Sequence, residues 1–194
     1  MSDAPVPAVS LRHDNWRQVL GEVCDRIGSV NRPALLCICG KPGAGKSTLA
    51  KLIRKQGLPG IPPRRICVID DGVLSVPVLW FFRKRVKFHS RDRDNLKPFQ
   101  PWLRGRQLVI YVGATPQRRL DRCDVVLRLR CPDEERLRRL VQRNSDGEKR
   151  FRKTEHVSDE IGIAAGHVFD MPALGTEPAT DAPVPATQAA EGQG

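Results

Sequence analysis

Short apolar runs alternate with amphipathic stretches along the middle of the chain. Residues 34–39 (ALLCIC) form one such run, and others occupy residues 65–69, 107–112 and 125–129. Apolar runs of this length are typical of strands that are buried on both faces of a sheet. The pattern therefore predicts four buried strands at these positions.

Three stretches next to these strands have the periodicity of helices. The first helix is predicted over 12–27, where apolar residues recur at Trp16, Val19, Leu20, Val23 and Ile27. The second is predicted over 46–56 and ends at Gly57. The third begins at Pro132; its first turn carries Asp133, Glu134 and Glu135, and its apolar stripe is Leu137, Leu140 and Val141. Strands alternating with helices predict an α/β fold, with a parallel sheet of about five strands and helices on both faces.

The two ends of the chain differ in composition from the middle. Residues 172–194 are rich in Ala, Pro, Thr and Gly and contain no aromatic residue, so they cannot bury enough surface to offset the entropy of ordering. Residues 1–10 share the segment DAPVPA with this tail. We predict disordered termini over 1–10 and 172–194 and one folded domain over 11–171, which suits a chain of 194 residues.

The charge of the chain is concentrated in its middle. All 33 basic residues lie within residues 12–153, which hold 14 acidic residues and therefore have a net charge of +19. A segment this basic favours polyanionic partners such as phosphates, nucleotides or nucleic acid.

Several other classes of protein are disfavoured by the sequence. The longest apolar run, residues 73–82, is too short to span a bilayer, and the first residues lack the basic segment of a secretory signal. The six cysteines do not have the spacing of a zinc site. We therefore expect most of them to be buried small hydrophobic residues, and we expect a cytoplasmic protein.

The most specific motif is GKPGAGKS at residues 40–47, followed by Thr48, which fits the pattern G-x-x-x-x-G-K-[ST]. It lies between an apolar strand and an amphipathic helix. In such a loop the backbone N–H groups and the start of the helix surround phosphate. Lys46 is expected to contact the β- and γ-phosphates of ATP, and Ser47 to bind Mg²⁺. The predicted nucleotide-binding residues are Gly40, Lys41, Pro42, Gly43, Ala44, Gly45, Lys46, Ser47 and Thr48.

Two acidic residues, Asp70 and Asp71, follow the second predicted strand. In open α/β folds, ligands bind at the carboxyl ends of the parallel strands. One carboxylate is predicted to take a proton from an acceptor hydroxyl and the other, assigned to Asp70, to hold Mg²⁺. The alternative is an Asp-Asp-Gly turn in which one Asp caps a following helix.

Taken together, these segments resemble the small P-loop kinases, which include nucleoside monophosphate, gluconate and shikimate kinases, zeta-type toxins and polynucleotide 5′-kinases. The resemblance rests on GKPGAGKSTLA, on the strand that ends at Asp70-Asp71 and on DVVLRLRCPDEERLRRLVQRN at 124–144, and it spans about 35–153. It implies a parallel five-stranded sheet, ATP with Mg²⁺, and an arginine-bearing lid. The phosphate-binding arginines of the family fall on Arg139 and Arg143, with Arg150 as a third.

One departure from many P-loop proteins concerns the third predicted strand, which continues as LVIYVGATP without an acidic residue. Asp70 must therefore serve Mg²⁺, or phosphate transfer is inefficient. We predict a phosphotransferase that moves the γ-phosphate of ATP to a hydroxyl or phosphate of a small anionic or hydroxyl-bearing acceptor. The alternatives are a polynucleotide 5′-kinase and a nucleotide-binding regulatory or assembly protein with low turnover.

Two further segments of the chain are rich in basic residues. Residues 81–97 carry seven basic and two acidic residues among aromatic ones. Because related kinases hold their acceptor in the insert after the second strand, this segment is predicted to stack a base or bind a phosphate, with nucleic acid as an alternative partner. A solvated charged helix is the competing interpretation, and a membrane surface is disfavoured by Pro77. Residues 148–153 (EKRFRK) are predicted to form a lid over ATP or a solvated loop.

Overall fold

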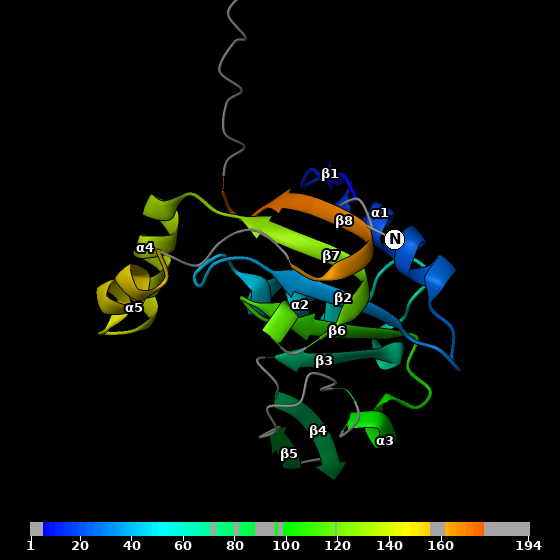
Figure 1. Ribbon diagram of the computed structural model, residues 1–194. Coiled ribbons are helices and arrows are strands. Elements are labelled where there is room, and N and C mark those ends of the chain that lie inside the picture. Colours follow the sequence, from blue (N-terminus) through cyan, green and yellow to red (C-terminus); the bar gives the residue numbers. More distant parts are fainter. Residues whose placement is uncertain are drawn as a thin grey trace, which may run out of the picture.

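The computed structural model describes residues 6–70, 73–79, 82–87, 96, 99–118, 120–155 and 162–176; for 73–79 and 82–87 it describes the backbone. In this part of the chain, eight strands form one sheet in the order β1-β8-β7-β2-β6-β3-β4-β5 (Figure 1). The strands are β1 Ala8–Ser10, β2 Ala34–Cys39, β3 Ile66–Asp70, β4 Val73–Leu79, β5 Phe82–Lys87, β6 Leu108–Val112, β7 Arg122–Arg130 and β8 Ala164–Pro172.

The sheet has a parallel part and an antiparallel edge. The six strands from β1 to β3 in the sheet order pair in parallel, whereas β4 pairs antiparallel with both β3 and β5. The predicted parallel α/β sheet is confirmed, and the hairpin of β4 and β5 extends it at one edge. All four strands predicted from the apolar runs are present as β2, β3, β6 and β7.

The described helices are α1 Trp16–Ile27, α2 Lys46–Gln56, α3 Gln100–Leu103, α4 Asp133–Arg143 and α5 Gly147–Lys153. The helix predicted over 12–27 begins only at Trp16, because the preceding residues form a turn closed by the backbone bond from the Asn15 N–H to the Arg12 carbonyl. Within the described part of the chain, no helix has both the length and the apolar character needed to cross a membrane.

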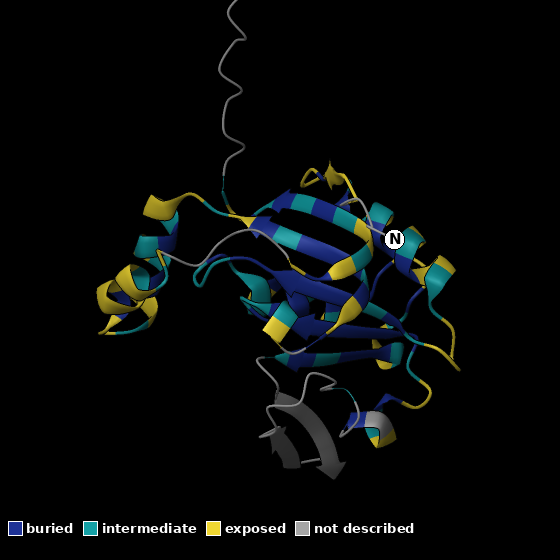
Figure 2. Cartoon of the chain, in the orientation of Figure 1, coloured by how far each residue is buried: buried dark blue, intermediate teal, exposed yellow. Residues whose placement is uncertain are grey.

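Alternate residues of the central strands fill two hydrophobic cores, one on each face of the sheet. In β2, Leu36 and Ile38 pack with residues of α1 and α2, whereas Cys37 and Cys39 pack with the segment around α3. Figure 2 shows these central strands as the most buried part of the chain. Helices therefore lie on both faces, but the second face is covered by the four-residue α3 and by loops in the described residues.

Besides the hairpin of β4 and β5, the strands β1 and β8 lie where the sequence predicted no strand. Residues 8–10 fall in the predicted disordered N-terminus, yet they form β1 and pair with Val168, Phe169 and Asp170 of β8. β8 itself pairs along its length with β7. Backbone hydrogen bonds to a neighbouring strand order β1 although its own side chains are exposed. The tail predicted to be disordered over 172–194 is ordered at its start, because β8 ends at Pro172 and Ala173 is buried. Residues 177–194 lie outside the described residues.

The basic segment at 81–97 also differs from one prediction. Its first part forms β5, so the solvated-helix interpretation is wrong for Phe82–Lys87. Most of the remainder lies outside the described residues. The lid segment at 148–153 is helical as part of α5.

The cysteines behave as predicted, because five of them are buried and Cys131 is half-buried. Burial raises the pKa of the thiols of Cys24 and Cys39 to about 12. A thiol with so high a pKa stays protonated and unreactive at neutral pH.

The strand order places a crevice beside the end of β2. β2 lies between β6 and β7, and the chain builds β3 and β6 on one side before it builds β7 and β8 on the other. Such a reversal of strand order opens a ligand site at the carboxyl ends of the strands. The arrowheads of the parallel strands point to this edge, where α4 and α5 also lie (Figure 1).

Candidate functional site

The loop between β2 and α2 takes a conformation that depends on glycine. Gly40, Gly43 and Gly45 have φ angles of 134°, 89° and 87°, which side chains rarely permit. A Cβ on Gly40 would also lie 2.6 Å from the carbonyl oxygen of Leu129. The glycines thus let the loop turn tightly, so that α2 begins at Lys46 with its N-terminal N–H groups at the loop.

Lys46 lies folded over this loop. Its Nζ donates hydrogen bonds to the carbonyl oxygens of Gly40, at 2.7 Å, and Lys41, at 3.0 Å. Ser47 is half-buried and Thr48 is exposed in the same first turn of α2. The loop therefore gathers an ammonium group, two hydroxyl groups and the positive end of a helix dipole at one place.

A cavity of about 280 Å³ opens at this loop. Its walls come from the loop, from the ends of β3 and β6, and from the helices α4 and α5. It is lined by Pro42, Gly43, Gly45, Lys46, Ser47, Thr48, Asp70, Ala114, Leu140, Arg143, Asn144 and Arg150. Among these lining residues, Asp70 carries the carboxylate and the remaining charged groups are cationic.

Asp70 reaches the cavity because it is the last residue of β3. It is half-buried and stands opposite Val112 of β6, which in turn stands opposite Ile38 of β2. Two strand spacings of a sheet, about 10 Å, therefore separate Asp70 from the strand that leads into the loop. The structure thus brings together two motifs that are 24 positions apart in the sequence, Lys46 and Asp70.

The neighbouring Asp71 lies outside the described residues. The element after the acidic pair is β4, and Asp70 itself pairs with Val73 of that strand. An Asp that caps a following helix, the alternative interpretation of the pair, is therefore wrong.

The predicted arginines divide into two groups. Arg143 of α4 and Arg150 of α5 line the cavity. The guanidinium of Arg139 is instead held beside it, by Oε1 of Glu135 at 2.6 Å and the carbonyl oxygen of Leu174 at 2.8 Å. Hydrogen bonds from Arg138 and Arg139 lower the pKa of Glu135 to about 2, so its carboxylate stays charged and holds Arg139 in place.

Arg150 has a partner of its own on the lid. Its Nε donates to Oδ2 of Asp146 at 2.9 Å, and this bond lowers the pKa of Asp146. The pair spans one turn at the start of α5 and is exposed. Because exposed ion pairs add little to stability, we assign this pair the role of orienting Arg150.

Arg136 was not among the residues predicted from the sequence to contribute to the site. Its side chain is only 1% exposed. Its Nε donates to the carbonyl oxygen of Pro42 in the loop, at 3.1 Å, and its NH2 donates to Oγ1 of Thr154 at 3.3 Å. The same guanidinium pairs with Asp133 and lies 5.0 Å from the ring centroid of Phe151. One buried cation of α4 thus connects the loop between β2 and α2 with the residues of α5 and its C-terminal end.

Replacement of Arg136 by alanine is expected to lower the free energy of unfolding by at least about 2 kcal/mol, because hydrogen bonds to a buried charged group are lost. Arg138→Ala is the matched control: Arg138 lies on the same helix, is 60% exposed and pairs only with Glu135 among the described contacts. The control is expected to cost at most about 1 kcal/mol. Urea unfolding measures both values. Equal losses of unfolding free energy in the two variants would contradict the role assigned to the contacts of Arg136.

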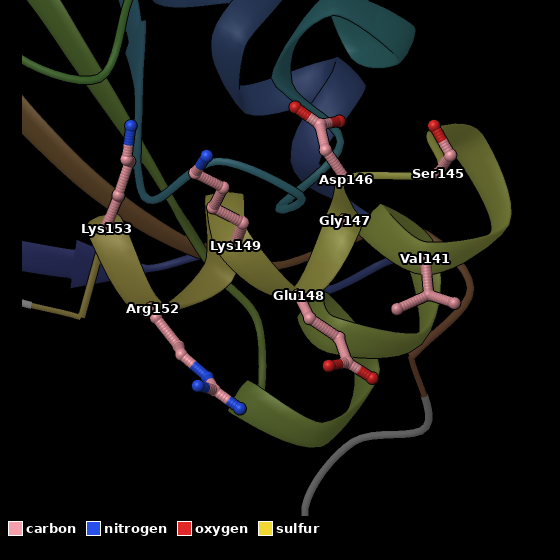
Figure 3. Close-up of a pocket in the computed structure, with 8 residues that line it drawn as sticks. All are labelled: Val141, Ser145, Asp146, Gly147, Glu148, Lys149, Arg152 and Lys153. Carbon is pink, nitrogen blue, oxygen red and sulfur yellow. The ribbon is translucent and has the colours of Figure 1, made fainter.

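The helices α4 and α5 are packed closely at Gly147, the first residue of α5. A Cβ at this position would lie 2.5 Å from backbone atoms of Leu140 and Val141 in α4. A second hollow, of about 580 Å³, lies at α4 and α5 and is lined by the residues labelled in Figure 3. There Lys149 and Lys153 extend from one side of α5 and Arg152 from the other (Figure 3). The packing at Gly147 therefore leaves no room for a side chain between α4 and α5, and Arg150 of α5 lines the cavity at the loop.

Gly147→Ala is expected to force α5 away from α4 and to destabilise the protein by about 1–3 kcal/mol, the usual cost of overpacking. Because the shift separates Arg143 from Arg150, nucleotide affinity should fall as well. Gly162→Ala is the control, since its nearest described heavy atom would lie 3.9 Å away. Thermal unfolding and nucleotide titration of both variants test this, and identical behaviour would contradict it.

The helix α4 also corrects the predicted apolar stripe. Leu140 is buried, but Val141 is 49% exposed and lines the second hollow. The buried position beside Leu140 is taken by Arg136, because the partner surface offers the carbonyl of Pro42 rather than an apolar contact.

Comparison with known proteins agrees with this geometry. A family model described as an AAA domain, AAA_18, matches residues 36–161, which include the loop, Asp70 and the helices α4 and α5. No curated protein matches the chain.

Proposed function

The chain belongs to the AAA_18 family of AAA domains, and we propose that it uses this P-loop NTPase fold as an ATP-dependent phosphotransferase. One observation carries the proposal: the cavity at the loop contains Asp70 together with Lys46, Arg143 and Arg150. A site that only held nucleotide would need the loop and Lys46. A carboxylate opposite the loop and arginines on a lid are what transfer of a phosphoryl group requires in addition.

The residues of the cavity fit a nucleotide with a divalent cation. Lys46 lies within reach of the loop interior, and its ammonium would move from the carbonyls of Gly40 and Lys41 to the phosphates. The Ser47 hydroxyl and the Asp70 carboxylate line the same cavity and are the hard oxygen ligands that Mg²⁺ prefers. Bound there, Mg²⁺ would neutralise charge on the phosphates.

The remaining groups suit the transfer itself. Arg143 and Arg150 approach the cavity from the lid and would stabilise the charge on the transferring phosphoryl group. We assign Asp71, next to the metal-binding Asp70, the role of accepting the proton of the acceptor hydroxyl. The acceptor oxygen then bonds to the γ-phosphorus as the bond to ADP breaks.

The test of this proposal is a screen with ATP labelled in the γ-phosphate against nucleosides, sugars and oligonucleotides with a 5′-hydroxyl. We expect label to appear on an acceptor of one of these classes, and the labelled product to be lost in Asp70→Asn. ATP consumption without labelled product would leave only a hydrolytic or regulatory role.

A second candidate, a nucleotide-binding regulatory protein with low turnover, is favoured by one feature of the sheet. β6 ends at Tyr111 and Val112 and continues into Gly113 and Ala114, so the strand beside β2 supplies no carboxylate to the cavity. ATP hydrolysis that is slow and unaffected by every acceptor in the screen would support this candidate.

A further inference from the structure

Three of the four cations of β5 occupy alternating positions along this strand. β5 reads FRKRVK and is the last strand in the sheet order. Because successive residues of a strand belong to opposite faces, Arg83, Arg85 and Lys87 share one face, and Lys84 shares the other with Phe82 and Val86. Three of the four cations are therefore in one row, which we call the β5 row.

The pairing of the strands connects this row to Asp70. Asp70 is opposite Val73 of β4, and Val73 is opposite Lys87 of β5. Residues directly opposite one another share a face of the sheet. Lys87 is thus on the face of Asp70 and in the same cross-strand line, two strand spacings or about 10 Å away.

The direction of the strands determines where the row begins. β4 is antiparallel to β3, and β5 is antiparallel to β4, so β5 runs in the direction of β3. Its last residue, Lys87, is therefore at the edge that carries the phosphate loop. Arg85 and Arg83 follow at steps of about 7 Å, and the row extends about 14 Å away from that edge.

Given the phosphotransferase activity proposed above, we propose that the acceptor is a single-stranded nucleic acid whose phosphodiester backbone binds along the β5 row and whose terminal hydroxyl reaches the cavity at Asp70. A small acceptor bound at Asp70 would extend no farther than Lys87 and would not reach Arg85 or Arg83. The two cations farther along the row match a polyanion with regularly spaced charges. The net charge of +19 over residues 12–153 complements such a partner.

The alternation provides a matched pair of variants. Arg85→Gln and Lys84→Gln remove one charge each from adjacent positions of the same strand, but only Arg85 belongs to the β5 row. Long-range attraction falls equally in both variants, whereas direct phosphate contacts fall only in Arg85→Gln. Each lost contact with a single strand lowers the log–log dependence of affinity on salt by about 0.7.

The experiment is fluorescence anisotropy with the full chain and a labelled oligothymidylate that carries a free 5′-hydroxyl, without ATP, over a series of salt concentrations. We expect the slope to fall by about 0.7 in Arg83→Gln, Arg85→Gln and Lys87→Gln and to be unchanged in Lys84→Gln. Equal slopes in all four variants, or no salt-dependent binding, would overturn the proposal. So would vesicles containing phosphatidylserine, if they bound with the same dependence on the row and the oligonucleotide did not.

Two controls keep the outcomes separate. ATP affinity of the four variants should equal that of the wild type, which shows that each is folded and that the loop is intact. Label transfer to a nucleoside that persists while oligonucleotide binding is absent would overturn the β5 row and leave the phosphotransferase standing. Oligonucleotide binding along the row without any label transfer would support the β5 row and overturn the phosphotransferase.

Discussion

Lys46→Ala is expected to abolish tight ATP binding while the fold survives. Nζ of Lys46 is the cationic group held inside the loop, 2.7 Å from the carbonyl oxygen of Gly40. It is a compact point charge on phosphate, and a hydrogen bond between charged groups contributes about 1.5–3 kcal/mol. Its loss should weaken ATP binding by up to about 100-fold in calorimetry.

The fold should survive because the loop is held by its glycines and by the bond from Arg136 to Pro42, neither of which involves the Lys46 side chain. Lys51→Ala is the matched control, since Lys51 is an exposed lysine of the same helix. Its ATP affinity should equal that of the wild type. Equal affinity in Lys46→Ala and Lys51→Ala would show that the loop does not bind the nucleotide.

Asp70→Asn and Asp71→Asn are each expected to lower kcat far more than they weaken ATP binding. Asparagine keeps the size of the side chain but removes the negative charge that would hold Mg²⁺ or take the acceptor proton. Loss of a general base costs about 10²- to 10⁴-fold in rate. ATP affinity changes little, because the cationic groups on the phosphates are untouched.

The control for the acidic pair is Asp14→Asn, an exposed carboxylate that pairs with Arg12 near the N-terminus. The measurement is acceptor-dependent ADP release at saturating ATP, with the ATP affinity of each variant measured by calorimetry. Unchanged turnover in both single variants and in the double variant would leave the pair as no more than a turn between β3 and β4.

Local patterns in the sequence were sufficient to predict the phosphate loop and the parallel strands around it. The glycines at 40, 43 and 45 identify the loop because their positive φ angles disfavour other residues, and a Cβ at position 40 would also lie too close to Leu129. The strands β2 and β6 are buried on both faces, so each reads as an uninterrupted apolar run. Asp70 lines the cavity because it is the last residue of the parallel strand β3, which is the position that the sequence predicted for it; its role in the site stays a prediction.

Features that depend on distant partners were not predictable in the same way. Arg136 reads as one more charged residue on an amphipathic helix. Its burial depends on partners that its own helix pattern does not reveal, among them the distant carbonyl of Pro42 and the hydroxyl of Thr154. β8 was missed because its sequence, AAGHVFDMP, is not an uninterrupted apolar run and only Phe169 and Met171 are buried. The strand is ordered by its pairing with β7 and β1. The hairpin of β4 and β5 was missed because its register depends on pairing with β3.

The most direct test of the central claim, that the cavity at Asp70 transfers phosphate, is to follow label from the γ-phosphate of ATP in the wild type and in Asp70→Asn, with the same acceptor and at saturating ATP. We expect a labelled acceptor with the wild type and a rate about 10²- to 10⁴-fold lower with the variant, at nearly equal ATP affinity. Equal rates of label transfer in the two proteins would contradict it.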